Sequence, residues 1–265
     1  MTSTEDDHPF ADGFLSEAVN EVKAHVHQKY KPLVELSYET NRRAVALQHE
    51  LNIHLEDTSE KLAAAFYART LAFTQSSMLL LERGMPTQAR TVLRAGIECM
   101  FPLAALARDR SLAARIVESH DADRRSIVDR IKRWTNPALR ASIEAGISSE
   151  ELAAISGTTG KSTSVFDYAK LADMEEWYLT IYMLLSFSAH SKLSDLDRHI
   201  VVNSEGVPTE FQNEPDISKQ DAVWGWGIEV QTIAMRSVGT IFAKHVSDVE
   251  ILRSRLAKLA EPFAR

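Results

Sequence analysis

The sequence predicts an all-α fold, an antiparallel multi-helix bundle with peripheral helices, and three observations lead to this prediction. The 265 residues include only ten Gly and eight Pro, while helix-favouring Ala, Leu, Glu, Arg and Lys are plentiful. Cap and turn residues stand where helices would begin and end. Only the stretch near 199–212 has β-branched runs around a turn, and it predicts one small β-hairpin.

The first part of the chain is predicted to contain a tail and a bent helix. Residues 1–12 are acidic and are expected to form a disordered tail. A helical stretch then runs from about residue 14 to residue 54. Pro32 should bend this stretch, because a proline ring disrupts the helical turn before it.

A helical hairpin follows. Asp57 offers a capping side chain for a helix that continues through Leu81. Gly84 suits a reversal of the chain, and Pro86 suits the first turn of a new helix. The helix predicted over 87–108 should therefore return antiparallel to its predecessor.

The remaining elements are predicted from helical periodicity and from punctuation by Asn, Pro, Ser and Gly. No internal repeat and no long linker divides the chain, so 13–265 should form one helical domain with its core at 55–200. Helices are expected at about 111–134, 138–145, 149–156, 173–191, 218–245 and 248–259, with the hairpin at 199–212.

Composition narrows the function classes. The formal net charge of −7 argues against a broadly basic nucleic-acid surface, although a local patch could still bind phosphate. Cys99 is the only cysteine, which excludes an internal disulfide and a Cys-based metal cluster. The N-terminus does not resemble a signal peptide, and no run approaches the roughly 20 apolar residues of a membrane span. We therefore expect a cytoplasmic protein with no membrane partner.

A first polar ladder lies in an otherwise apolar helix. Arg90, Arg94 and Glu98 follow one another at four-residue spacing, which places them on one helical face. Arg94 and Glu98 can pair, and two interpretations of the pair stay open. The pair either fixes the helix register as a buried ion pair, or it lets Glu98 orient Arg94 to present a fork to phosphate or carboxylate.

A second polar ladder has the same spacing, with Tyr178, Tyr182, Ser186 and His190 in one apolar helix. His190 could act as a general base or proton shuttle, or it could be a helix cap or a satisfied core group. Reactive side chains are dense here, because Ser191 and Lys192 follow directly. Such density exceeds what packing requires.

Buried charges and hydroxyls are costly unless they are paired, so we expect the two ladders to face each other around one polar pocket. No metal or other cofactor is expected; His25 and His27, for example, diverge by about 200° on a helix. The candidate catalytic residues are His190, Arg94 and Glu98, and the candidate substrate-binding residues are Arg90, Tyr178, Tyr182, Ser186, Ser191 and Lys192.

The hairpin with RTVLRAGIECMF and the later SFSAHS segment resemble a bacterial family catalogued as domain of unknown function 5677. An Arg-x-x-x-Glu helix and a later Ser-x-x-x-His motif mark that family. Here they are Arg94 with Glu98 and Ser186 with His190. The resemblance covers roughly 55–200, and the family in turn looks related to the HEPN helical domains.

Active HEPN domains are metal-independent ribonucleases of defence and toxin systems, and the resemblance implies that activity. In such an endoribonuclease His190 would take the 2′-hydroxyl proton, while Arg94, held by Glu98, would stabilise the phosphorane. Tyr182 and Ser186 would position the phosphate.

The sequence departs from the HEPN nuclease motif. Active members carry an Arg shortly before the His on the same helix, whereas Leu184, Leu185 and Ser186 stand at those positions. Either Arg94 supplies the cation from a neighbouring helix, or the protein is non-catalytic. RNA is the expected partner of a ribonuclease. The alternatives are a non-catalytic module that binds a small anionic ligand or a partner peptide, and a helical scaffold with structural polar networks. A homodimer also stays open.

Overall fold

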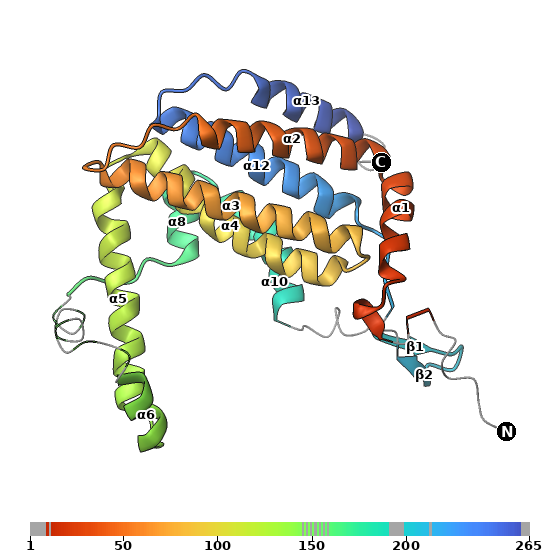
Figure 1. Cartoon of the computed structure of the whole chain (residues 1–265), viewed down its shortest axis with the longest axis horizontal. Coiled ribbons are helices and arrows are strands. Elements are labelled where there is room, and N and C mark those ends of the chain that lie inside the picture. Colours follow the sequence, from red (N-terminus) through yellow and green to blue (C-terminus); the bar gives the residue numbers. More distant parts are fainter. Residues whose placement is uncertain are drawn as a thin grey trace.

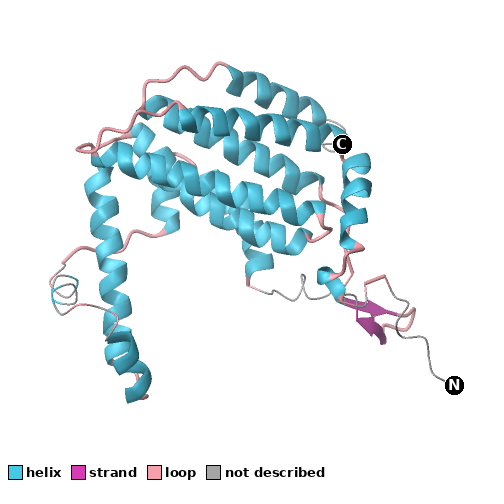
Figure 2. Ribbon diagram, viewed as in Figure 1, coloured by secondary structure: helices cyan, strands magenta, loops and turns pink. Residues whose placement is uncertain are grey.

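The computed structural model describes residues 9–10, 12–144, 159–190, 199–211 and 214–260, and isolated positions between 145 and 158. Three predictions fall largely or wholly on other residues: the tail at 1–12, the helix at 149–156, and the site residues Ser191 and Lys192. The described chain is helical almost throughout (Figure 2).

The predicted bend in the first helical stretch is confirmed. After a short 3₁₀ turn at Gly13–Leu15, helix α1 spans Val19–Lys29 and α2 spans Lys31–His49. Tyr30 separates them with φ −109° and ψ 23°. Pro32 lies in the first turn of α2, where its missing N–H has no helical partner to lose. Figure 1 shows α1 turned across the end of the bundle.

The predicted helical hairpin is also confirmed. Helix α3 spans Thr58–Glu82, and α4 spans Pro86–Arg108 and runs back against it (Figure 1). The Asp57 side chain accepts a hydrogen bond from the backbone N–H of Glu60, 3.0 Å away, which caps α3 as expected. Gly84 makes the reversal with φ +70°.

The remaining elements match the expected positions, with one addition. The strands pair antiparallel, with Ile200 opposite Phe211, so the predicted hairpin is confirmed. The addition is α8, which begins at Ser164 with a capping box that Asp167 completes. The elements are α5 (Leu112–Lys132), α6 (Pro137–Glu144), α8 (Val165–Leu171), α9 (Glu175–Trp177), a π-helical turn (Tyr178–Tyr182), α10 (Met183–Ala189), β1 (Ile200–Val202), β2 (Pro208–Phe211), α12 (Asp221–Ile241) and α13 (Asp248–Ala260).

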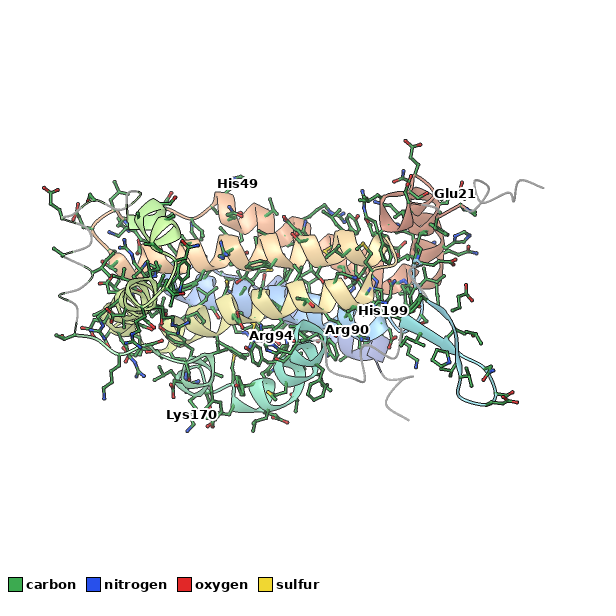
Figure 3. All side chains as sticks on the ribbon, turned by 90° about the horizontal axis from the view of Figure 1, so that it is seen from below. Glu21, His49, Arg90, Arg94, Lys170 and His199 are labelled. Carbon is green, nitrogen blue, oxygen red and sulfur yellow. The ribbon has the colours of Figure 1, made fainter. Side chains whose placement is uncertain are left out.

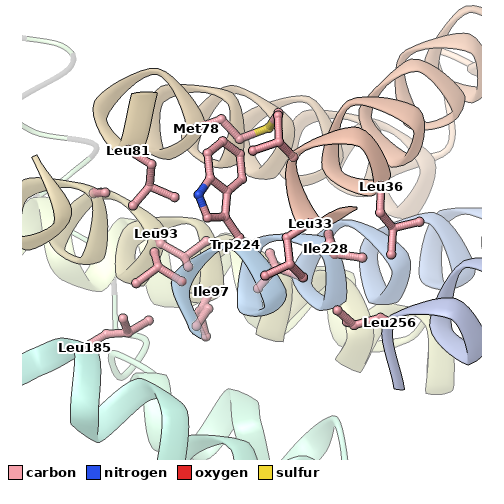
Figure 4. Close-up of a cluster of buried hydrophobic side chains, with 14 of the residues drawn as sticks. Leu33, Leu36, Met78, Leu81, Leu93, Ile97, Leu185, Trp224, Ile228 and Leu256 are labelled. Atoms are coloured by element: carbon pink, nitrogen blue, oxygen red, sulfur yellow. The ribbon is translucent and has the colours of Figure 1, made fainter. Parts of the chain in front are cut away.

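The core forms around α12, which packs against α2, α3 and α4. Trp224 of α12 lies among Leu81 of α3 and Leu93 and Ile97 of α4, all of them buried (Figure 4). Each such side chain contributes roughly 1.5–3 kcal/mol on burial. Helices α8 and α10 cover α4, while α5 and α6 extend away from the bundle (Figure 1). None of the described helices has the length and apolarity to span a bilayer.

The α3–α4 turn supplies a stability prediction. A Cβ atom at Gly84 would lie 2.6 Å from Pro215 Cβ, and the Gly84 carbonyl also accepts a hydrogen bond from the Asp216 N–H at 2.7 Å. We expect Gly84→Ala to lower the free energy of unfolding by about 2–4 kcal/mol, because the clash adds to the cost of a positive φ.

Gly206 is the matched control, since it has φ +76° and no atom within 4 Å of its would-be Cβ. Gly206→Ala should cost only about 1–2 kcal/mol. Urea denaturation of both variants measures the difference, and equal losses would show that the contact with Pro215 does not constrain the turn.

Candidate functional site

The two predicted ladders meet, and the Arg94 guanidinium is the centre of the contact. Arg94 Nε donates to Ser186 Oγ at 2.9 Å, and Arg94 Nη2 donates to Tyr182 Oη at 2.5 Å. Nη2 also pairs with Glu98 Oε1 at 3.0 Å, one helical turn along α4. Partners on two helices therefore fix the plane of the guanidinium.

The hydroxyls of Tyr182 and Ser186 each donate their proton within this cluster. Tyr182 Oη donates to Glu98 Oε1 at 2.8 Å, and Ser186 Oγ donates to the Tyr182 carbonyl at 2.7 Å. A hydroxyl has one proton to give, and both side chains are buried. Tyr182 and Ser186 therefore hold Arg94 in place, and neither has a proton left for a bound phosphate.

Aromatic packing supports the same group. The Tyr182 ring stacks on the Tyr178 ring with centroids 4.8 Å apart, and Arg94 Cζ lies 4.7 Å from the Tyr182 centroid. Phe166 of α8 also packs against Tyr178, with ring centroids 4.9 Å apart. A guanidinium over an aromatic face gains a further cation–π attraction.

The helix that carries the second ladder is irregular at this point. The Met183 N–H bonds to the carbonyl of Tyr178, five residues back, which defines the π-helical turn. Such turns widen the helix and occur often at functional sites. This turn holds one more residue than a turn of an α-helix. The direction of the Tyr178 side chain relative to Tyr182 and Ser186 therefore cannot be taken from four-residue spacing alone.

The environment changes the acidity of Tyr182. Burial raises the pKa of its phenol, and the hydrogen bond to the Glu98 carboxylate raises it further. The nearby Arg94 charge lowers the pKa, but the net change is strongly upward. The phenol therefore stays protonated and keeps donating to Glu98 at all physiological pH values.

Part of the site remains open to solvent. The Arg94 side chain is 21% exposed and the Glu98 side chain is 33% exposed. Within the described part of the chain, Arg94 Nη1 makes no hydrogen bond. One edge of an otherwise fixed guanidinium thus faces outward with donors to spare.

Of the other predicted site residues, Arg90 and His190 lie near this centre, and Ser191 and Lys192 lie outside the described residues. Arg90 is partly exposed one turn before Arg94, on the side of α4 that faces α10 (Figure 3). His190 is exposed just after α10, and its backbone N–H donates to the Ser186 carbonyl at 3.1 Å. The structure therefore joins Arg94, Glu98, Tyr182 and Ser186, with His190 one turn farther on.

Sequence reasoning missed Phe166, because it missed the short helix α8. The signal was present: Ser164 and Asp167 have the spacing of a capping box, in which each side chain accepts from the other residue's backbone N–H. A helix beginning there places Phe166 in its first turn.

The part of the chain that contains this site matches a known protein family. The model of a family of unknown function (DUF5677) matches residues 60–207, more than half of the 265-residue chain. The match contains the whole Arg94 cluster. No curated protein matches the chain significantly, and neither does any solved structure.

The Tyr182 hydroxyl gives a prediction for stability and its pH dependence. Tyr182→Phe keeps the ring but removes a buried bridge between Arg94 and Glu98, so unfolding at pH 7 should cost about 1–2 kcal/mol less. Because the native pKa is raised, this contribution is complete below the ordinary tyrosine pKa of about 10 and declines as the pH rises toward the native value.

Denaturation with guanidinium chloride at pH 7 and at pH values above about 10 measures the difference in unfolding free energy between wild type and Tyr182→Phe. Tyr178→Phe is the matched control, since the Tyr178 ring stacks but its hydroxyl makes no hydrogen bond with the described residues. If both variants lost the same stability, the bridge to Arg94 would not be what Tyr182 contributes.

Proposed function

Since the chain belongs to the DUF5677 family, whose function is unknown, we propose from the site itself that the protein binds a small anionic ligand through Arg94. The observation that carries the proposal is the open Nη1 edge of a guanidinium held on its other sides by Glu98, Tyr182 and Ser186. Fixed donors bind with little loss of side-chain entropy.

The chemistry of the site favours a ligand with planar or tetrahedral oxygens. The two N–H groups of Nη1 can donate to the oxygens of a carboxylate or a phosphate group. Glu98 partly neutralises Arg94, so net attraction is small and hydrogen-bond geometry should decide the affinity. Arg90, one turn away on the same helix, adds a second cation on this side of α4.

The test is a substitution that keeps the charge and removes the guanidinium. Arg94→Lys should weaken binding of citrate or pyrophosphate by about tenfold or more, or about 1.4 kcal/mol, because a lysine has no second nitrogen to hold one edge in place while another donates to the ligand. Isothermal titration calorimetry measures the affinity, and ligand-dependent thermal stabilisation provides a second measurement.

Arg69→Lys is the matched control for this test. Arg69 also lies over an aromatic ring, with its Cζ 5.0 Å from the Phe73 centroid, but it is exposed on α3. Its substitution should leave the affinity unchanged. Equal affinities for wild type and Arg94→Lys would contradict the proposal. Loss of stability without any ligand binding would support the scaffold alternative.

A metal-independent ribonuclease is the second candidate, and the position of His190 favours it. His190 is exposed and follows Ser186 by one turn, on the helix that contacts Arg94. The HEPN resemblance points to the same chemistry. His190 would accept the 2′-hydroxyl proton, the 2′ oxygen would attack phosphorus, and the 5′ oxygen would leave with a proton from solvent, giving a 2′,3′-cyclic phosphate.

Cleavage of a fluorescently labelled single-stranded RNA, with EDTA present, tests this candidate. We expect His190→Gln to lower the rate by about 10²-fold or more if His190 is the general base. His49→Gln is the control, because His49 is exposed at the end of α2. Identical rates in wild type and His190→Gln would remove His190 from the mechanism.

A further inference from the structure

A second polar cluster lies at the opposite end of α3 from its Asp57 cap, and the Arg94 site does not use it. Its centre is Glu82, whose side chain is only 3% exposed. His27 Nε2 lies 2.6 Å from Glu82 Oε1, and Tyr38 Oη donates to the same oxygen at 2.5 Å. Lys23 Nζ donates to Oε2 at 2.9 Å. The donors come from α1 and α2, so three helices meet at one carboxylate.

The position of Glu82 is unfavourable for a carboxylate. It is the last residue of α3, where the helix dipole is negative and repels an anion. Burial alone would raise the pKa of Glu82, but hydrogen bonds from Tyr38, Lys23 and His27 lower it, and the net pKa lies below the ordinary value. The carboxylate is therefore ionised, and its charge is maintained entirely by these donors.

An ionised Glu82 determines how His27 is presented. A carboxylate only accepts hydrogen bonds, so the His27 Nε2 must carry the proton that lies between them. The Tyr38 ring packs edge-on against the imidazole, with centroids 6.0 Å apart. The ring is thus fixed by two neighbours, while its side chain remains 37% exposed. A buried carboxylate that accepts from one ring nitrogen fixes the orientation of a histidine in the same way at many functional sites.

The exposed side of this cluster borders an open pocket of about 410 Å³. Lys23 uses one of its three N–H donors on Glu82, and Arg42 makes no hydrogen bond or ion pair with the described residues. Glu35 carries the opposing charge, and Lys31 lies 4.0 Å from it. The pocket is lined by Lys23, His27, Val34, Glu35, Tyr38 and Arg42.

We propose that this pocket binds the phosphate group of a small ligand, with Arg42 and Lys23 donating to its oxygens, His27 beside them, and Glu82 as the positioning residue. A phosphate presents acceptors in several directions, which suits donors on two different helices. Val34 provides an apolar surface beside the cations, so an organic phosphomonoester suits the pocket better than the inorganic ion.

The experiment is a ligand titration followed by NMR of the imidazole resonances. It uses the Arg94→Lys variant, in which binding at the Arg94 site is weakened. Inorganic phosphate and glycerol 3-phosphate are the probes. The His27 resonance, assigned with His27→Gln, should shift with a Kd of about 1 mM or tighter for the phosphomonoester. Arg42→Gln should weaken binding about tenfold or more. Arg43→Gln should not, since Arg43 pairs with Asp248 and Glu39 instead.

Sulfate tests the cations without an ester group, because it presents the same tetrahedral oxygens as a phosphate. Sulfate should bind to the Arg94→Lys variant, and Arg42→Gln should weaken that binding as well. The pocket would be refuted by an unshifted His27 resonance at about 10 mM glycerol 3-phosphate, or by unchanged binding in Arg42→Gln. Neither result bears on the Arg94 site.

Discussion

Ionised groups inside a helical bundle must find hydrogen-bond partners, and this constraint determines how the outer helices of this protein attach. An unpaired charge removed from water costs several kcal/mol. Arg94 projects from α4, and its partners beyond that helix are Tyr182 of the π-helical turn and Ser186 of α10. Glu82 ends α3 and is satisfied only when α1 and α2 supply their donors. The apolar core around α12 joins α2, α3 and α4, and each of the two charged centres adds hydrogen bonds between helices.

The two centres share one organisation. In each, buried partners hold a single side chain, and that side chain keeps one edge toward solvent. Glu98, Tyr182 and Ser186 hold Arg94, whereas Glu82 and Tyr38 hold His27. For Arg94 the edge is Nη1, and for His27 it is the nitrogen opposite Glu82. Such supported side chains lose little freedom when a ligand arrives. Their outward edges, rather than the buried groups, are where ligand specificity would be determined.

Helical periodicity and capping residues were enough to predict the bundle, the bend near Pro32, the α3–α4 hairpin and the small β-hairpin. They also predicted that the ladders of Arg94 and Tyr182 would meet, because four-residue spacing is visible along a sequence. The Glu82 cluster was not predictable in this way. Its donors come from two earlier helices, and no local spacing connects them to α3. The π-helical turn likewise depends on tertiary packing and leaves no sequence period.

The geometry of Ser186 separates the two halves of the Ser-x-x-x-His motif. The Ser186 hydroxyl accepts from Arg94 and donates to the Tyr182 carbonyl, so it has no proton left for substrate. Its role is to hold the guanidinium at a fixed angle. His190 makes no side-chain hydrogen bond with the described residues, and it is exposed one turn later. Any chemistry in this motif must therefore come from the histidine, and a protein that only binds its ligand would still need the serine.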